Sequence, residues 1–207
     1  MDIRYWLRNF LIVGALLGVI TLINSVRPFA ASESGIFEVG SIVVLAAMLL
    51  AWGALALRPL TVAHVQSNAL HAFAAVFAAV SFAGIGRETT WGAVYGVSRT
   101  TELMLTNISI VIFAAMLLYG LALWVMCTSG RLASARVFFR SRSWGWIAFG
   151  LVVFVFADLF EKHLIPVANS GLYEEVLELI AYGSVLLGAM EATRRQKLSP
   201  DAAGAAK

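Results

Sequence analysis

The chain has 207 residues, of which 60% are hydrophobic and only 13% charged, and its formal net charge is +3. An ordinary soluble domain is about 45–50% apolar and about 25% charged, and a water-soluble fold would leave much of this excess exposed to aggregation. The composition therefore excludes an ordinary soluble domain and predicts a membrane protein for which lipid is the solvent. The single cysteine, Cys127, excludes an intramolecular disulfide and any multi-cysteine metal site.

Six apolar segments approach the length of about 20 residues that a bilayer core requires. In chain order they are 10–26, 36–57, 64–86, 104–127, 144–160 and 172–190. The first has the basic start and apolar run of a secretory signal, and we interpret it as a first transmembrane helix. We therefore predict one all-α domain over residues 1–207, a polytopic transmembrane helical bundle of about six spans.

Lysine and arginine divide unequally between the two sides when these segments are threaded alternately through a membrane. With the N-terminus inside, one side holds Arg4, Arg8, Arg58, Arg131, Arg136, Arg140, Arg142, Arg194, Arg195, Lys197 and Lys207. The other side holds only Arg27, Arg87, Arg99 and Lys162. By the positive-inside rule, both termini are expected in the cytoplasm of a bacterial cell with this protein in its inner membrane.

The basic loop 130–144, GRLASARVFFRSRSW, then lies on the cytoplasmic surface. Its arginines would meet anionic lipid headgroups, and Trp144 would lie at the interface. Because membrane topology already accounts for these charges, we expect lipid as the partner of this loop and no nucleic acid.

The acidic residues divide in the opposite direction, with nine of the twelve on the periplasmic side. These are Glu33, Glu38, Glu88, Glu102, Asp158, Glu161, Glu174, Glu175 and Glu178. Since acidic residues contribute little to membrane topology, this clustering is not explained by insertion and indicates a functional surface.

Helical spacing places Glu175, Glu178 and Tyr182 on one stripe of the last span, at i, i+3 and i+7. A carboxylate one to two turns inside the membrane must face the bundle, pair with a cation or carry a proton. On the fifth span, Asp158 precedes Lys162 by four residues, so a local ion pair is available.

The third span carries a polar face of His64, Ser67, Asn68 and His71 on its cytoplasmic half. His71 would lie about 10 Å beyond His64, where it could relay protons. Haem b is a weaker hypothesis, because two histidines seven apart on one helix face cannot both ligate the same iron.

The segment between the third and fourth spans is too polar to cross a membrane and contains RETTWG, residues 87–92. We interpret it as an outer loop with a short interfacial piece, with Trp91 at the headgroups. Arg87 could bind the adjacent Glu88 or reach the acidic residues of the last hairpin.

RETTWG followed by Asn107, and YEEVLEL at the start of the last span, resemble a group of bacterial multi-pass membrane proteins without a known activity. That group has an acidic-x-[Ser/Thr]-Trp-Gly motif after a middle span and a Glu-rich start to its final helix. This chain has Arg87 where a second acidic residue is expected. The resemblance implies that Glu88, Trp91 and the last-helix glutamates belong to one site.

Three functions are compatible with these features. The first is a non-catalytic subunit of a larger membrane assembly, packed against other subunits or as a homo-oligomer. The second is a cation- or proton-coupled transporter or channel. The third is a metal-dependent intramembrane enzyme acting on lipid, although no nucleophile elbow, HExxH or phosphate-binding loop is present. A divalent metal ion would be held by Glu88, Asp158, Glu175, Glu178 and His163, with Arg87, Trp91 and Tyr182 in support.

Overall fold

The computed structural model describes residues 36–58, 69–90, 96–127, 130–165, 167 and 170–198. They form α2 (Ile36–Ala56), α4 (Leu70–Thr89), α5 (Arg99–Met126), α6 (Arg131–Phe139), α7 (Arg142–Glu161) and α8 (Ser170–Leu198). All but α6 are long and apolar enough to cross a membrane. The all-α, multi-pass membrane class is therefore confirmed, while the predicted first span, 10–26, lies outside the described residues.

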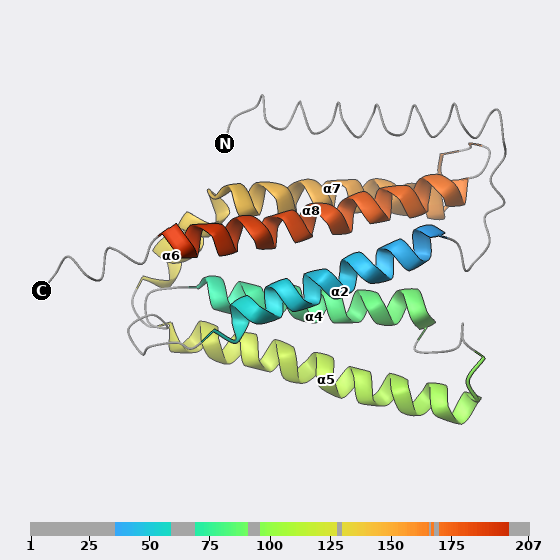
Figure 1. Cartoon of the computed structure of the whole chain (residues 1–207), viewed down its shortest axis with the longest axis horizontal. Coiled ribbons are helices and arrows are strands. Elements are labelled where there is room, and N and C mark those ends of the chain that lie inside the picture. Colours follow the sequence, from blue (N-terminus) through green and yellow to red (C-terminus); the bar gives the residue numbers. More distant parts are fainter. Residues whose placement is uncertain are drawn as a thin grey trace, which may run out of the picture.

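The five long helices lie side by side and alternate in direction along the chain (Figure 1). The pair α2 and α4 lies in the middle, with α8 and then α7 on one side and α5 on the other. The short α6 lies at one end of the bundle, between α5 and α7 in the chain. The packed pairs α2–α4, α4–α5 and α7–α8 are antiparallel, whereas α2 and α8 run in the same direction.

The charges sort to the two ends of this bundle, as the sequence predicts. One end, here called the acidic end, is formed by the starts of α2, α5 and α8 and the ends of α4 and α7. It carries Glu38, Glu88, Glu102, Asp158, Glu161, Glu174, Glu175 and Glu178. The opposite, basic end carries Arg58, Arg131, Arg136, Arg140, Arg142, Arg194 and Arg195. Which face of the membrane each end meets stays a prediction.

Serine caps decide where two of the spans begin. The Ser98 hydroxyl accepts a hydrogen bond from the Thr101 amide and starts α5, five residues before the predicted 104. The Ser141 hydroxyl accepts one from Trp144 in the same way and starts α7. Such caps satisfy amides that have no partner inside the helix, so each helix extends back to its serine.

The basic segment 130–144 is not a loop, in contrast to the prediction. Residues Arg131–Phe139 form the helix α6, which begins after Gly130 in the left-handed region at φ 75°. Arg131 bonds back from Nε to the Cys127 carbonyl at 2.6 Å and so caps the end of α5. The segment therefore links α5 to α7 as an ordered helical corner at the basic end.

Small residues let α7 and α8 approach closely. A Cβ atom added to Gly150 would lie 2.7 Å from the Ala181 carbonyl oxygen, and one added to Gly188 would lie 2.9 Å from Ile147. The Ser143 hydroxyl donates a 2.7 Å hydrogen bond to the Gly188 carbonyl across the same interface. In lipid, where no hydrophobic force drives helices together, such close contact is what holds a helix pair.

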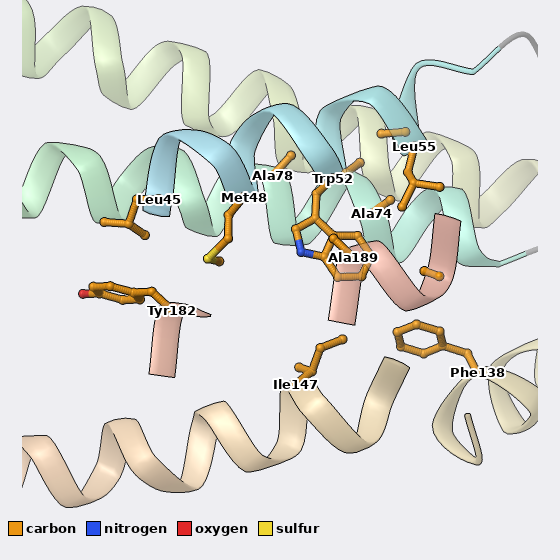
Figure 2. Close-up of a cluster of buried hydrophobic side chains, with 13 residues drawn as sticks. Leu45, Met48, Trp52, Leu55, Ala74, Ala78, Phe138, Ile147, Tyr182 and Ala189 are labelled. Atoms are coloured by element: carbon orange, nitrogen blue, oxygen red, sulfur yellow. The ribbon is translucent and has the colours of Figure 1, made fainter. Parts of the chain in front are cut away.

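A buried cluster joins this pair to α2 and α4 (Figure 2). Trp52 of α2 is completely buried at its centre, with its ring 4.9 Å from that of Phe77 on α4. The labelled members around it are Leu45, Met48, Leu55, Ala74, Ala78, Phe138, Ile147, Tyr182 and Ala189. Four spans thereby share one core, which fixes how α4 and α8 face each other at the acidic end.

Candidate functional site

The site is built around Arg87, in the last turn of α4, which reaches across to α8. Its Nη1 donates a 2.5 Å hydrogen bond to Oε1 of Glu178, whose side chain is only 8% exposed. A charge-assisted bond of this kind is stronger than one between neutral groups. The expectation that Arg87 could reach the acidic residues of the last hairpin is therefore confirmed.

Three further carboxylates surround the same guanidinium. Its nitrogens lie 3.8 Å from Glu88, 3.8 Å from Glu161 and 3.9 Å from Glu174. We call Arg87, these four glutamates and Tyr182 the Arg87 cluster. It joins α4, α7 and α8, and one positive charge faces four carboxylates.

Tyr182 closes the cluster on its buried side. Its hydroxyl donates a 3.1 Å hydrogen bond to Glu88 and accepts a 3.3 Å bond from Arg87 Nη1. The Arg87 guanidinium also lies over the ring of Phe154 on α7, 5.7 Å from its centroid. A cation held against a ring in this way gains further attraction in a low-dielectric setting.

Two more glutamates lie beside the cluster. Glu175 interacts electrostatically with Glu38 and Glu178. The Oε2 atom of Glu38 is buried and has no hydrogen-bond partner among the described residues. The carboxylates in and beside the Arg87 cluster thus outnumber the one guanidinium that faces them.

Searches for related proteins do not assign this site. No protein family, no curated protein and no solved structure matches the chain. The resemblance to bacterial multi-pass proteins therefore stays a prediction.

Four of the residues singled out from the sequence, Arg87, Glu88, Glu178 and Tyr182, are brought together in the Arg87 cluster. Trp91, which the resemblance places in the same site, lies outside the described residues. The motif and the Glu-rich helix therefore do meet in space, as far as the described chain extends.

Asp158 and His163 stand apart from the cluster. Asp158 accepts a 2.6 Å hydrogen bond from Lys162, which is the local ion pair predicted from their spacing. This bond raises the pKa of the Lys162 ammonium above its ordinary value. His163 is exposed and its Nδ1 lies 3.1 Å from the Ser170 hydroxyl.

The predicted metal site has no support in the described part of the chain. No three histidine, cysteine, aspartate or glutamate side chains there are grouped so that they could hold a metal ion. The carboxylates that do converge have a guanidinium between them as counter-ion. The metal site therefore stays a prediction.

His71 contacts a helix carbonyl. It is buried, and its Nδ1 lies 2.8 Å from the Leu55 carbonyl near the end of α2. Tyr119 of α5 donates a 3.1 Å bond to the next carbonyl, that of Ala56. These two side chains satisfy helix-end carbonyls that would otherwise lack partners. The proton relay stays a prediction, and His64 lies outside the described residues.

The prediction grouped Glu175, and not Glu174, with Glu178 and Tyr182 on α8, and it did not single out Glu161 on α7. Arg87 contacts Glu174, Glu178 and Tyr182, which are spaced i, i+4 and i+8 along α8. From the sequence, Glu161 was named only as one of the nine acidic residues on the predicted periplasmic side. Its place at the end of α7, next in the chain to the start of α8, was the signal that could have located it.

Proposed function

We propose that this chain is a proton-coupled membrane transporter in which the Arg87 cluster is the proton-exchange site. One observation carries the proposal: four carboxylates from three helices share a single guanidinium at one end of a membrane bundle. Carboxylates so close together cannot all stay charged without further cations. In this proposal the proton is the cation that the site takes up.

Glu88 and Glu178 are the proton acceptors in this proposal. Their side chains are 11% and 8% exposed, and both lie against Arg87 and Tyr182. A proton on Glu178 removes its negative charge and weakens the bond that ties α8 to α4. Proton binding is thereby linked to movement between two helices, which is what a coupled transporter requires. With the acidic end at the periplasmic face, the proton enters from outside.

Infrared difference spectroscopy of the protein reconstituted in lipid tests the site. As the pH is lowered, wild type should gain the carbonyl band of a protonated carboxylic acid. Glu178→Gln or Glu88→Gln should remove part of this band. Glu102→Gln is the matched control, because Glu102 pairs with Arg99 on α5, away from the cluster. An unchanged band in both cluster variants would overturn the proposal.

Proton flux into liposomes containing the protein tests transport. After an acid step, with charge compensation by a potassium carrier, wild type should acidify the interior faster than protein-free liposomes, and Glu178→Gln should not. If the carboxyl groups titrate but no proton flux is seen, with or without candidate solutes, the transport proposal is overturned. The cluster would then be a structural element that binds protons.

A second candidate function is a subunit of a larger membrane assembly. It is favoured by α5, which contacts mainly α4 and exposes the rest of its surface. Purification in mild detergent separates the two: a constant set of co-purifying polypeptides supports the subunit, and a single polypeptide supports the transporter. The third reading, a metal-dependent lipid enzyme, needs a metal site that the described residues do not supply.

A further inference from the structure

The helix α5 meets the bundle along one stripe only. Its contacts are mainly with α4, and the residues turned inward recur at spacings of three and four. They are Glu102, Thr106, Ser109, Phe113, Met116, Gly120 and Leu123. At Gly120 the helices are so close that an added Cβ would lie 3.2 Å from Ala75 and 3.3 Å from the Ala72 carbonyl. This stripe, with its alternating spacings of three and four, forms the packing interface between α5 and α4, as in a heptad repeat.

The opposite side of α5 repeats the same spacing with no described neighbour. The exposed residues of this outer seam are Met104, Asn107, Val111, Ala114, Leu118, Leu121 and Val125. Val111 and Leu118, near its middle, are 68% and 65% exposed. Lipid could cover the apolar members of this seam, so exposure alone does not indicate a protein partner.

Asn107 is the polar member of the outer seam, and lipid tails cannot form hydrogen bonds with its side-chain amide. It is exposed, it lies four residues or about 6 Å inside the apolar run that begins at Leu103, and it makes no hydrogen bond with any described residue. An amide in hydrocarbon without a partner is costly, since nothing in lipid replaces its bonds to water. A polar group facing it at the same depth would remove this cost.

We propose that two copies of the chain associate side by side through the outer seam of α5, with the two Asn107 side chains hydrogen-bonded across a two-fold axis along the membrane normal. Copies inserted in the same direction bring their α5 helices together in parallel, so that each residue meets itself at one depth. A side-chain amide both donates and accepts, and a pair of them is self-complementary. Any other partner would have to supply a matching group at that depth.

The rest of the outer seam suits this arrangement. Alternating spacings of three and four match a left-handed parallel helix pair, in which one asparagine in the seam fixes register and partner number. Ala114, one heptad after Asn107, lets the two helices approach closely. The seam lies apart from the Arg87 cluster, so failure of the dimer and failure of the proton site are separate results.

Measurement of the mass of the protein in mild detergent over a dilution series tests the dimer. Asn107→Leu should raise the dissociation constant about tenfold, in line with hydrogen bonds between membrane helices. Asn107→Gln, which keeps an amide at that place, should retain most of the association. A monomeric wild type, or a Leu variant that dimerises as tightly as wild type, would overturn the proposal.

Disulfide cross-linking in native membranes identifies the occupant. Val111→Cys and Leu118→Cys should each yield a covalent dimer of this chain, whereas Val155→Cys, equally exposed but on α7, should not. Wild type serves as the blank, because its one cysteine, Cys127, is buried. Cross-linking of Val111→Cys to a different polypeptide would show that another protein covers the outer seam and would overturn the dimer. Cross-linking within one chain of the double variant Val111→Cys/Thr21→Cys would show that segment 10–26 covers it and would overturn the dimer as well.

Discussion

Arg87 on α4 and Glu178 on α8 are 91 positions apart in the chain and are joined by a 2.5 Å hydrogen bond. The bond ties together two spans that also share the buried cluster around Trp52. It is the contact through which the charge on a glutamate can influence how two membrane helices pack.

Removing the guanidinium should destabilise the bundle. In Arg87→Gln the carboxylates lose their shared cation, and the free energy of unfolding should fall by about 2 kcal/mol. This is below the cost of breaking a fully buried pair, because the Arg87 side chain is 42% exposed and partly screened. Thermal unfolding in detergent measures the change.

The double variant Arg87→Gln/Glu178→Gln provides the control for this result. If the two side chains act through their bond, the effects of the single changes should not add, and the double variant should be more stable than their sum predicts. Additive losses would mean that each side chain stabilises the bundle independently.

Two glycines allow the packing of α7 against α8 to be tested directly. Gly150→Ala places a methyl group 2.7 Å from the Ala181 carbonyl, so the helices must separate and stability should fall by about 1–3 kcal/mol. Gly183→Ala meets nothing within 4 Å and should be neutral or stabilise by about 0.5–1 kcal/mol. Equal effects on the unfolding temperature would contradict close packing at Gly150.

His71 can be tested as a helix cap and as a proton relay in one experiment. His71→Ala should cost about 1–3 kcal/mol in the free energy of unfolding, because the buried Leu55 carbonyl loses the imidazole beside it. His71→Asn retains a short donor and should recover part of that stability. If the Asn variant is stable but no longer moves protons in liposomes, the relay gains support; retained flux would argue for a cap alone.

The ion pair between Lys162 and Asp158 predicts a pH effect at high pH. Because the hydrogen bond to Asp158 raises the pKa of Lys162, any stabilisation is complete below the unfolded value of 10.5 and is lost as pH rises through the folded value. Asp158→Asn should bring the Lys162 pKa back toward 10.5 in an NMR titration, while Lys197 should not respond. An unchanged Lys162 pKa would show that the pair does not persist in solution.

Much of the architecture could be predicted from the chain because it depends on local sequence. Span length follows from runs of apolar residues, and the predicted segments 36–57, 104–127 and 172–190 each overlap one helix of the structure. The sorting of acids and arginines to opposite ends follows from alternate threading of those same runs. The helix α6 was missed because its arginines and small residues carry no apolar run of membrane length.

The site itself was only half predicted. Helical periodicity puts Glu178 and Tyr182 on one stripe, but a period of 3.6 allows either Glu174 or Glu175 to complete it. The rotation of α8 decides between them, and that rotation is set by its contact with α7 at Gly150 and Gly188. The sequence also places nine acids on one side without saying which of them share a cation.

The sequence alone thus determines that this chain is a multi-pass helical membrane protein with most of its acids and most of its arginines at opposite ends of the spans, because hydrophobic length and charge are read residue by residue. Only the tertiary structure decides which carboxylates meet and that Arg87 lies among them. That choice depends on which helices are neighbours and how each is rotated, which contacts between residues far apart in the chain determine.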